Sequence, residues 1–241
     1  MKKLQELISN SNYIIALTGA GISTLSGIRD FRGKNGLYKD FNADKIFDLN
    51  YFLQNPDYYY RQTKDFIYGL ENFKPSAIHN LLAELEKKGV VKSILTQNID
   101  MLHQKAGSKR VLELHGSPAK HYCLSCKKEY GFSEIAKVVK SGKTPKCEAC
   151  CGIIKPDVIF FGQQLHAQTL AKAQEETDKA DLMIVLGSSL VVNPAAFFPF
   201  DLARRGGKLI IVNDQPTPID KLAQLKFDSL ETFAQTYKFE S

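Results

Sequence analysis

Two glycines near the start of the chain have the spacing of a nucleotide-binding turn. Gly19 and Gly21 follow residues 13–17, an apolar run of strand length, which predicts a buried strand ending in a glycine turn. Such glycines let a backbone come close to a pyrophosphate, and Ser23 offers a hydroxyl at the next turn. The fingerprint is incomplete, because Thr24 stands where a dinucleotide-binding G-x-G-x-x-G has its third glycine. A tight strand-to-helix turn without a ligand is therefore the alternative.

The triplet Asp30, Phe31 and Arg32 adds a second chemical feature to this stretch. It places an acid, an aromatic face and a guanidinium within three residues, a combination that core packing does not need. A bound sugar or cation can use all three groups. The triplet favours a binding role.

An amide pair and a carboxylate follow the next predicted strand. Gln97, Asn98 and Asp100 come directly after residues 91–96. The carboxyl ends of parallel strands meet at one edge of a sheet, where α/β proteins place ligand contacts. These side chains are therefore candidates for catalysis. The alternative is that Asn98 or Asp100 caps a helix over 101–106.

A histidine follows the next short strand, residues 111–114, in the same way. His115 is a candidate general base at the same sheet edge, because the unperturbed pKa of histidine lies near neutrality. A hydrogen-bonded structural histidine is the alternative. His79 and His103 lie on predicted helices and are expected to be structural.

Four cysteines form two C-x-x-C pairs separated by 20 residues: Cys123, Cys126, Cys147 and Cys150. This spacing predicts a tetrahedral structural zinc site. Four thiolates leave no open coordination position, so the metal should not join the chemistry. Disulfides are the alternative, but five cysteines and an expected reducing compartment argue against them. Cys151 is a competing ligand, and His121 a less favoured one.

The remaining pattern predicts an α/β chain. Further strands are expected at residues 182–186 and 209–212; Gly187-Ser188-Ser189 and Asn213 follow them directly. Residues 156–162 are expected to be extended and to re-enter the sheet. Helices are predicted near the N-terminus and over 55–70, 78–88, 167–180, 192–205 and 218–239, with Asn55 as an N-cap followed by Pro56.

Composition indicates an ordinary globular protein. The 241 residues are 44% hydrophobic and 24% charged, which suffices for one large domain and a smaller insert. Residues 1–17 lack the apolar core of a signal peptide or anchor, so a cytoplasmic location and no membrane contact are expected. Residues 118–155 hold eight lysines and three glutamates. A solvated face is predicted there, and nucleic-acid binding is not expected.

Taken in order, these motifs resemble those of the sirtuin family, in particular a minimal bacterial member without terminal extensions. The match spans almost the whole chain. Besides the two cysteine pairs, it covers Gly19–Ser23, Gly27–Arg32, Gln97–Asp100, Leu114–Gly116, Phe161–Gly162, Gly187–Leu190 and Val212–Asn213.

The resemblance implies a Rossmann-like doubly wound parallel sheet with a small domain made of a zinc ribbon and a helical lid. The implied NAD-binding domain comprises residues 1–33, 75–117 and 156–241. The lid module, 34–74, and the zinc-ribbon module, 118–155, form the small domain. The implied activity is NAD-dependent removal of acyl groups from lysines of proteins or peptides. The acyl group passes to ADP-ribose, nicotinamide leaves, and one structural zinc ion is bound per chain.

Site residues follow from the same resemblance. The implied catalytic residues are His115 as base, Asn98 and Asp100. The implied NAD contacts are Gly19, Ala20, Gly21, Thr24, Asp30, Phe31, Arg32, Gln97, Asn98, Ile99, Asp100, Gly187, Ser188, Ser189, Asn213 and Asp214. The implied peptide-binding residues are Val158, Phe160, Phe161, Gly162, Val192, Asn193 and Pro194.

Three positions depart from the family pattern: Arg29 replaces a proline, Gln163 a glutamate and Cys151 a glycine. None removes a group that the chemistry needs. Thr63 and Phe66 stand where the desuccinylase branch has a Tyr-x-x-Arg pair, which favours neutral acyl groups. Two rival functions are mono-ADP-ribosyl transfer, against which the presence of Asn98 and His115 argues, and a catalytically silent NAD-binding or zinc scaffold.

Overall fold

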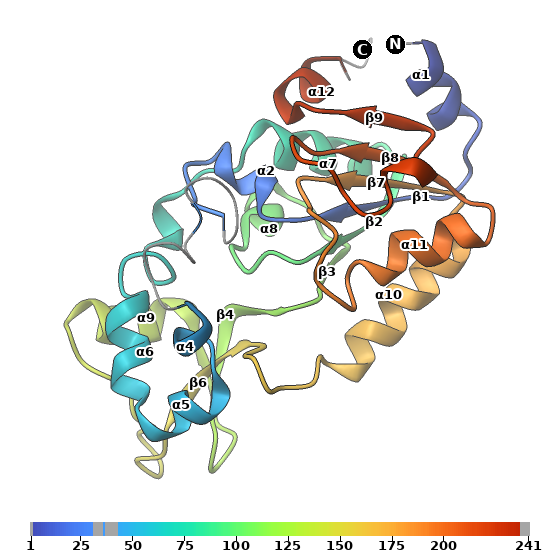
Figure 1. Cartoon of the computed structure of the whole chain (residues 1–241). Coiled ribbons are helices and arrows are strands. Elements are labelled where there is room, and N and C mark those ends of the chain that lie inside the picture. Colours follow the sequence, from blue (N-terminus) through green and yellow to red (C-terminus); the bar gives the residue numbers. More distant parts are fainter. Residues whose placement is uncertain (1, 31–35, 37–42, 237–241) are drawn as a thin grey trace.

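The computed structural model describes residues 2–30, 36 and 43–236. Two predicted NAD contacts, Phe31 and Arg32, lie outside these residues. The described chain forms two parts, each built around its own sheet (Figure 1). A six-stranded sheet lies at one end of the molecule and a three-stranded sheet at the other, which confirms the predicted α/β class.

The larger sheet has the strand order β3-β2-β1-β7-β8-β9, and every neighbouring pair is parallel. Its strands are β1 (Ile14–Thr18), β2 (Val91–Thr96), β3 (Val111–Glu113), β7 (Leu182–Leu186), β8 (Lys208–Val212) and β9 (Leu225–Phe227). Every residue of β1 and β7 is buried. This double-sided burial is why the two segments are continuous apolar runs.

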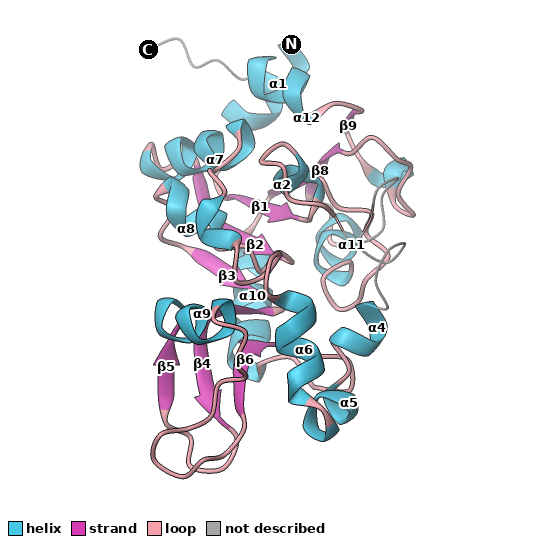
Figure 2. Ribbon diagram, turned by 90° about the vertical axis from the view of Figure 1, so that its left-hand side faces the viewer, coloured by secondary structure: helices cyan, strands magenta, loops and turns pink. Residues whose placement is uncertain are grey.

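Helices cover both faces of this sheet (Figures 1 and 2). One face packs against α1 (Lys2–Ser9), α7 (Ala77–Lys87) and α12 (Leu230–Thr236), and the other against α10 (Ala167–Lys179) and α11 (Phe197–Arg204). Successive residues of β1 alternate between the two cores, as the strand period requires. None of the described helices is both long and apolar enough to cross a membrane.

The strand order reverses beside β1. The chain runs from β1 to β2 and β3 on one side, then returns to β7, β8 and β9 on the other. In open parallel sheets, ligands bind in the crevice at the carboxyl ends of the strands where the order reverses. The short helices α2 (Gly21–Thr24) and α8 (Leu102–Ala106) follow β1 and β2 at this edge.

The smaller part combines an antiparallel sheet and one helix of the same segment with helices from an earlier segment (Figure 2). Its strands are β4 (Gly116–Cys123), β5 (Glu129–Gly131) and β6 (Ile154–Val158); its helices are α4 (Ala43–Ile46), α5 (Leu49–Gln54), α6 (Pro56–Thr63) and α9 (Phe132–Lys140). Aromatic rings join the two segments: the Phe160 centroid lies 5.6 Å from that of Phe47 and 5.3 Å from that of Phe52, both edge-to-face.

Two sequence predictions about this part are wrong. Residues 156–162 do not re-enter the larger sheet as predicted: 156–158 are extended but belong to β6, which pairs antiparallel with β4. The helix predicted over 55–70 begins as expected, with the Asn55 side chain accepting a hydrogen bond from Tyr58 N, but it ends at Thr63. The amides of Ile67 and Tyr68 both donate to Thr63 O, and both side chains are buried in the aromatic core. Tertiary packing therefore overrides helix propensity there.

Two further helix boundaries also differ from the prediction. The segment 218–239 is not one helix: a 3₁₀ turn, η2 (Asp220–Leu222), and β9 precede α12, and residues 237–239 lie outside the described chain. The edge pairing of β9 with β8 supplies hydrogen bonds that the local pattern does not reveal. Residues 193–196 form turns, and the regular helix starts at Phe197. A second 3₁₀ turn, η1 (Leu70–Asn72), precedes α7.

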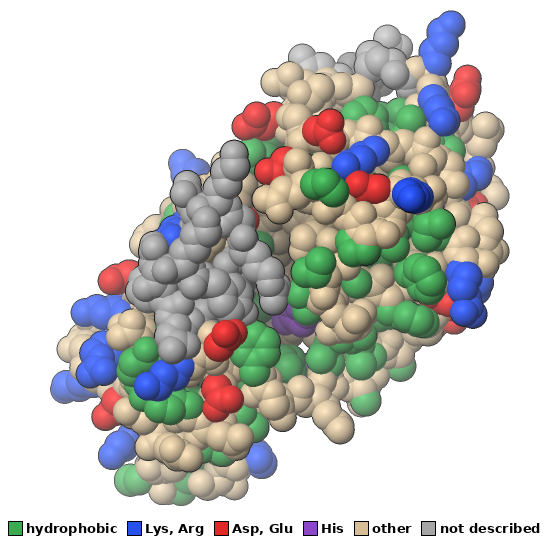
Figure 3. All heavy atoms as spheres, viewed as in Figure 1, with side chains coloured by type: hydrophobic (Ala, Val, Ile, Leu, Met, Phe, Trp, Pro, Cys, Tyr) green, Lys and Arg blue, Asp and Glu red, His purple; other side chains and the backbone are tan. Residues whose placement is uncertain are grey.

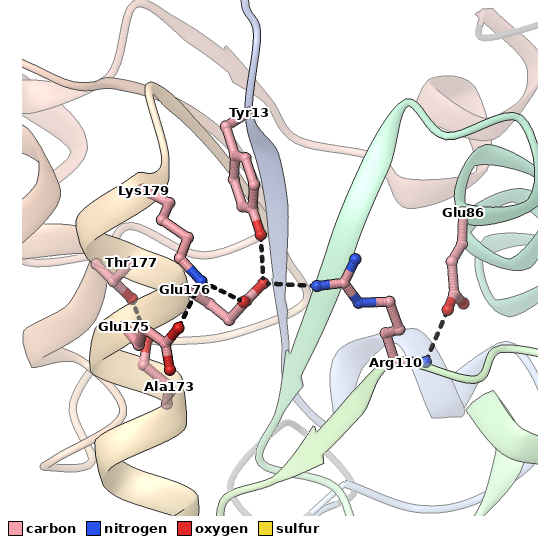
Figure 4. Close-up of polar contacts among 8 residues, drawn as sticks. All are labelled: Tyr13, Glu86, Arg110, Ala173, Glu175, Glu176, Thr177 and Lys179. Atoms are coloured by element: carbon pink, nitrogen blue, oxygen red, sulfur yellow. Dashed lines mark hydrogen bonds and ion pairs between the residues drawn. The ribbon is translucent and has the colours of Figure 1, made fainter.

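A buried carboxylate ties α10 to the amino ends of the strands (Figure 4). Glu176 Oε2 accepts a hydrogen bond from the Tyr13 hydroxyl (2.9 Å) and pairs with Arg110, while Lys179 lies 3.5 Å from Oε1. A cavity of about 330 Å³ beside it is lined in part by Leu112. This network lies at the sheet edge opposite to the predicted site.

Two buried histidines should make folding sensitive to acid. The rings of His79 and His103 lie 4.8 Å apart, and burial lowers their pKa values to about 4 and about 3. The folded protein keeps both rings neutral below pH 6.5, whereas the unfolded chain binds protons, so stability is lost as the pH falls. We expect each histidine to lower the unfolding free energy by about 1 kcal/mol between pH 7 and 5.5. In urea unfolding at these two pH values, the unfolding free energy of His103→Gln should fall by about 1 kcal/mol less than that of wild type. An equal fall in both proteins would contradict the prediction.

Candidate active site and metal centre

The ends of β1 and β7 form a turn built from backbone alone. Gly21 N donates a hydrogen bond to Gly187 O (2.9 Å). A Cβ on Gly19 would lie 2.6 Å from Gly187 O, and one on Gly187 would lie 2.6 Å from Ile22 N. Gly187 also has a φ of +62°, which glycine adopts without strain. The two glycine turns predicted separately from the sequence therefore form one cradle at the crevice.

Gly19→Ala should disrupt this cradle. The added methyl would overlap the backbone of Gly187, so the two turns must separate. We expect NAD affinity to fall at least about tenfold and the unfolding free energy to fall by about 1–3 kcal/mol. Calorimetric titration with NAD and urea unfolding measure the two effects. Gly131→Ala is the matched control, because it has open space and a φ of −80°. Unchanged NAD affinity in Gly19→Ala would show that the turn does not hold the cofactor.

Asn98 and Asp100 meet at the Ser23 hydroxyl. Ser23 Oγ donates to Asp100 Oδ2 (2.6 Å) and accepts from Asn98 Nδ2 (3.1 Å), which also donates to Gly19 O (3.0 Å). Asp100 Oδ1 accepts from Leu102 N (2.8 Å) at the start of α8. Asp100 therefore bonds the first amide of α8, whose N-cap is Met101, and is a member of the polar cluster at once. The cluster gives the amide and carboxylate fixed orientations beside the glycine turn.

His115 lies on the neighbouring strand connection in a defined tautomer. Its Nδ1 is 2.9 Å from Gln97 O, and a carbonyl oxygen only accepts, so Nδ1 carries the proton. In the neutral ring the lone pair is then on Nε2, the atom that can act as a base. The side chain of Gln97 reaches across the crevice, where the Nε2 of Gln97 donates a hydrogen bond to Ser188 Oγ (2.7 Å).

The other predicted NAD contacts lie around the same edge with differing exposure. Ser188 and Asn213 are buried, Asp30, Ile99 and Ser189 are partly buried, and Thr24 and Asp214 are exposed. Asn213 Nδ2 donates to Gln215 O (2.8 Å). Ser23 was expected only to offer a hydroxyl at the turn after the glycines and is not among the implied site residues. Its position two residues after Gly21 does not reveal that it bonds both Asn98 and Asp100.

The predicted peptide segment leaves β6 directly beside His115. Ile159 N donates to His115 O (2.9 Å), and Phe161 N donates to Phe47 O (2.7 Å). Phe160 is buried in the aromatic core, whereas Phe161 is 47% exposed. A hollow lies between the two parts of the molecule, and histidine side-chain atoms are visible in it (Figure 3). Of the second predicted segment, Val192 and Pro194 are partly buried and Asn193 is exposed, with a cis Asn193–Pro194 bond.

The four predicted cysteines converge on one point. The sulfurs of Cys123, Cys126, Cys147 and Cys150 all lie within 4.8 Å of one another. Zn–S bonds of about 2.3 Å place tetrahedral sulfurs about 3.8 Å apart, so the cluster fits one zinc ion. The Tyr130 hydroxyl donates to Cys147 Sγ (3.0 Å) and lowers the pKa of that thiol to about 6. This contact favours the thiolate that a metal requires.

Neither alternative ligand joins this cluster. Cys151 is exposed, with a φ of +57°, and its amide donates to Cys147 O (2.8 Å). His121 is fully buried, and its Nε2 contacts the Tyr68 hydroxyl (2.9 Å). Gly152 comes so close to the cluster that a Cβ there would lie 2.9 Å from Cys123 Sγ.

Comparison with known proteins gives consistent matches. The profile of the Sir2 family matches residues 19–194. An NAD-dependent protein deacetylase of Thermotoga maritima is 46% identical over 95% of this chain and 92% of its own length. A Sir2 structure with a deacetylated p53 peptide and 3'-O-acetyl ADP ribose is 45% identical, with a TM-score of 0.93 over 98% of this chain and 96% of that one. A Sir2 structure with a propionylated peptide is 43% identical, with a TM-score of 0.89 and the same coverage.

Proposed function

The chain belongs to the Sir2 family, and from this premise we propose how its residues carry out the reaction. The protein is an NAD-dependent protein-lysine deacetylase. Its substrates are NAD and acyl-lysine peptides or proteins, and it has a site for one zinc ion. The proposal concerns the roles of individual residues and the limits of the domains.

The NAD-binding domain comprises residues 1–33, 75–117 and 156–241, and the small domain comprises the lid, 34–74, and the zinc ribbon, 118–155. The separate apolar cores of the two parts support this division. The strands β4 and β6 run across two of these boundaries, so the domains share paired backbone near Gly116 and Val158. The lid and the ribbon form one unit because their aromatic side chains pack in a single core.

The cradle around Gly19 and Gly187 holds the pyrophosphate, because these two closely packed glycine turns stand at the carboxyl ends of β1 and β7, where parallel sheets bind nucleotides. Asn98 and Asp100 orient the ribose and nicotinamide, and Ser188 and Asn213 serve the adenosine side. NAD supplies the ribose carbon that the acyl oxygen attacks, the leaving nicotinamide, and the ribose hydroxyl that then receives the acyl group. The buried Ser23 cluster leaves the amide and carboxylate little freedom to reorient.

His115 removes the proton from the ribose hydroxyl at Nε2. The observation that carries this role is the Nδ1 contact with Gln97 O, which sets the tautomer of a base. Residues 158–162 and 192–194 bind the peptide on either side of the acyl-lysine. The zinc ion has four protein ligands and no open position, so it stabilises the ribbon and takes no part in the reaction.

One assay separates this function from its rivals. The protein is incubated with NAD and an acetylated peptide, and the products are identified by mass spectrometry. Deacetylated peptide with O-acetyl-ADP-ribose is the expected result. ADP-ribosylated protein instead would indicate a mono-ADP-ribosyltransferase, and neither product would indicate a silent NAD-binding scaffold.

Neutral acyl groups should be preferred over succinyl. Thr63 is fully buried with its hydroxyl donating to Tyr59 O (2.8 Å), and the Phe66 ring packs against Phe47. Neither position offers a charged partner to a buried carboxylate, which is costly to desolvate. We expect kcat/KM to be at least about tenfold lower for a succinylated than for an acetylated peptide of the same sequence. Comparable values would contradict this assignment of the two lid positions.

A cytoplasmic location is also proposed. Its support is the cysteine cluster, since thiolate ligands require reduced cysteines, which a reducing compartment maintains. Cell fractionation with detection of the protein tests it.

A further inference from the structure

One lysine of the small sheet is buried, although it belongs neither to the proposed catalytic residues nor to the zinc ligands. Lys155 on β6 is 1% exposed. Its Nζ donates hydrogen bonds to two carbonyls of its own strand, Pro156 O (3.0 Å) and Val158 O (2.6 Å). The same ammonium lies 4.0 Å from the centroid of the Phe160 ring. The side chain thus folds along the strand toward the point where β6 ends.

That point is the start of the proposed peptide segment. Beyond Val158, Ile159 N donates to His115 O (2.9 Å), and Phe160 N donates to the side chain of Gln163 (2.9 Å). Val158 itself is paired with Gly116, the residue after His115. The Lys155 ammonium therefore holds the carbonyl of Val158, the residue at which the chain leaves the paired strands β4 and β6 and enters residues 158–162. A shift there moves the segment relative to His115.

Stability alone does not account for a charge in this place. Within the described chain, no carboxylate lies at ion-pair distance from Lys155; Asp157, on the same strand, acts on it only at longer range. From β4, His121 and Tyr122 face it. Burial lowers the pKa of Lys155 to about 7. An ammonium buried without a carboxylate is costly, and an apolar side chain of similar length would avoid that cost.

We propose that Lys155 is a positioning residue for the acyl-lysine peptide: by holding the carbonyls of Pro156 and Val158, it sets the course of residues 158–162 beside His115. The proposal rests on the proposed function, because it takes these residues to bind the peptide. Its effect falls on the peptide and not on NAD. The glycine cradle follows β1 and β7 in the larger sheet, whereas both carbonyls that Lys155 holds belong to β6 of the small sheet.

The test compares Lys155→Met, Lys155→Arg and wild type in steady-state deacetylation with each substrate varied. Methionine keeps the length of the side chain and removes both donors. We expect the peptide KM to rise about tenfold, equivalent to about 1.4 kcal/mol, while the NAD affinity and the kcat at saturating peptide stay within about threefold. Arginine retains charge and donors and should restore most of the peptide affinity. Lys137→Met, at an exposed position of α9, is the control and should match wild type.

Two results would overturn the proposal. One is a folded, zinc-loaded Lys155→Met enzyme with an unchanged peptide KM. The other is an equal loss of peptide binding, NAD binding and kcat, which indicates a structural role only. A wild-type protein that produces neither deacetylated peptide nor O-acetyl-ADP-ribose would instead refute the proposed function.

A second measurement does not depend on the folding of Lys155→Met. If the contacts of Lys155 affect peptide binding, the coupling is reciprocal, so peptide binding must in turn change the surroundings of Lys155. In wild-type protein labelled with 15N-lysine, saturating acetylated peptide should shift the Lys155 Nζ resonance, which is assigned from its absence in Lys155→Arg. A resonance that does not move at saturation contradicts the proposal whatever the behaviour of Lys155→Met.

Discussion

His115→Ala should almost abolish deacylation. A positioned general base accelerates its step by about 10²- to 10⁴-fold, or about 3 to 5 kcal/mol of barrier. His115 holds its proton on Nδ1 against Gln97 O, which leaves Nε2 to act as the base. Because we place this base after nicotinamide has left, the two halves of the reaction should respond differently. Exchange of labelled nicotinamide into NAD, in the presence of acetylated peptide, should survive better than deacylation.

Asn98→Ala is the contrast for this experiment. The Asn98 amide is held between Ser23 Oγ and Gly19 O, where we propose that it contacts the ribose, so its loss should depress exchange as well as deacylation. Both rates are measured for both variants, with zinc content and thermal melting as controls for folding. A folded His115→Ala protein that deacylates at nearly the wild-type rate would make His115 structural and the mechanism wrong.

Cys147→Ser should remove the zinc ion and unfold the ribbon. Structural zinc in small modules contributes an apparent 10–16 kcal/mol, roughly, and metal binding is coupled to folding. Cys147 is 1% exposed, and its sulfur accepts a hydrogen bond from the Tyr130 hydroxyl, so the loss of this sulfur also disturbs the packing of β5. We expect less than one zinc per ten chains by atomic emission. Activity should be lost with it, because β4 and β6 carry the connections to His115 and the peptide segment.

Cys151→Ser is the matched control, since Cys151 is adjacent in sequence but outside the cluster of sulfurs. It should keep one zinc ion per chain and wild-type melting. If Cys151→Ser loses zinc while Cys150→Ser retains it, the fourth ligand has been assigned one residue too early.

The local sequence pattern was sufficient to predict those elements whose structure is determined within a single segment. The strand predicted at 182–186 is β7, because burial on both faces demands a continuous apolar run. The strand predicted at 91–96 is β2, where Val91, Ile94 and Leu95 supply the buried apolar positions. The four zinc ligands were likewise predictable, since two C-x-x-C turns each place two sulfurs on the same ion. Asn55 followed by Pro56 marked the start of α6 for a similarly local reason.

Predictions failed where a distant partner decides the local structure. The three residues of β9 are a strand because β8 offers an unpaired edge, and β6 joins β4 because the ribbon closes on itself. The end of α6 at Thr63 depends on burying Ile67 and Tyr68 in an aromatic core shared with the ribbon. No window of sequence contains these partners.

The sequence by itself determined which chemical groups this protein has and at which strand ends they lie: the paired glycines, the Asn98 and Asp100 pair, His115 and the cysteines. Only the tertiary structure decided how they are held. Ser23 reaches Asp100 across 77 positions of the chain and Asn98 across 75, and Gly19 fits against Gly187 only when β1 and β7 are neighbours. The physical reason is that hydrogen bonds and close contacts depend on distances in space, which sequence spacing fixes only within one helix, strand or turn.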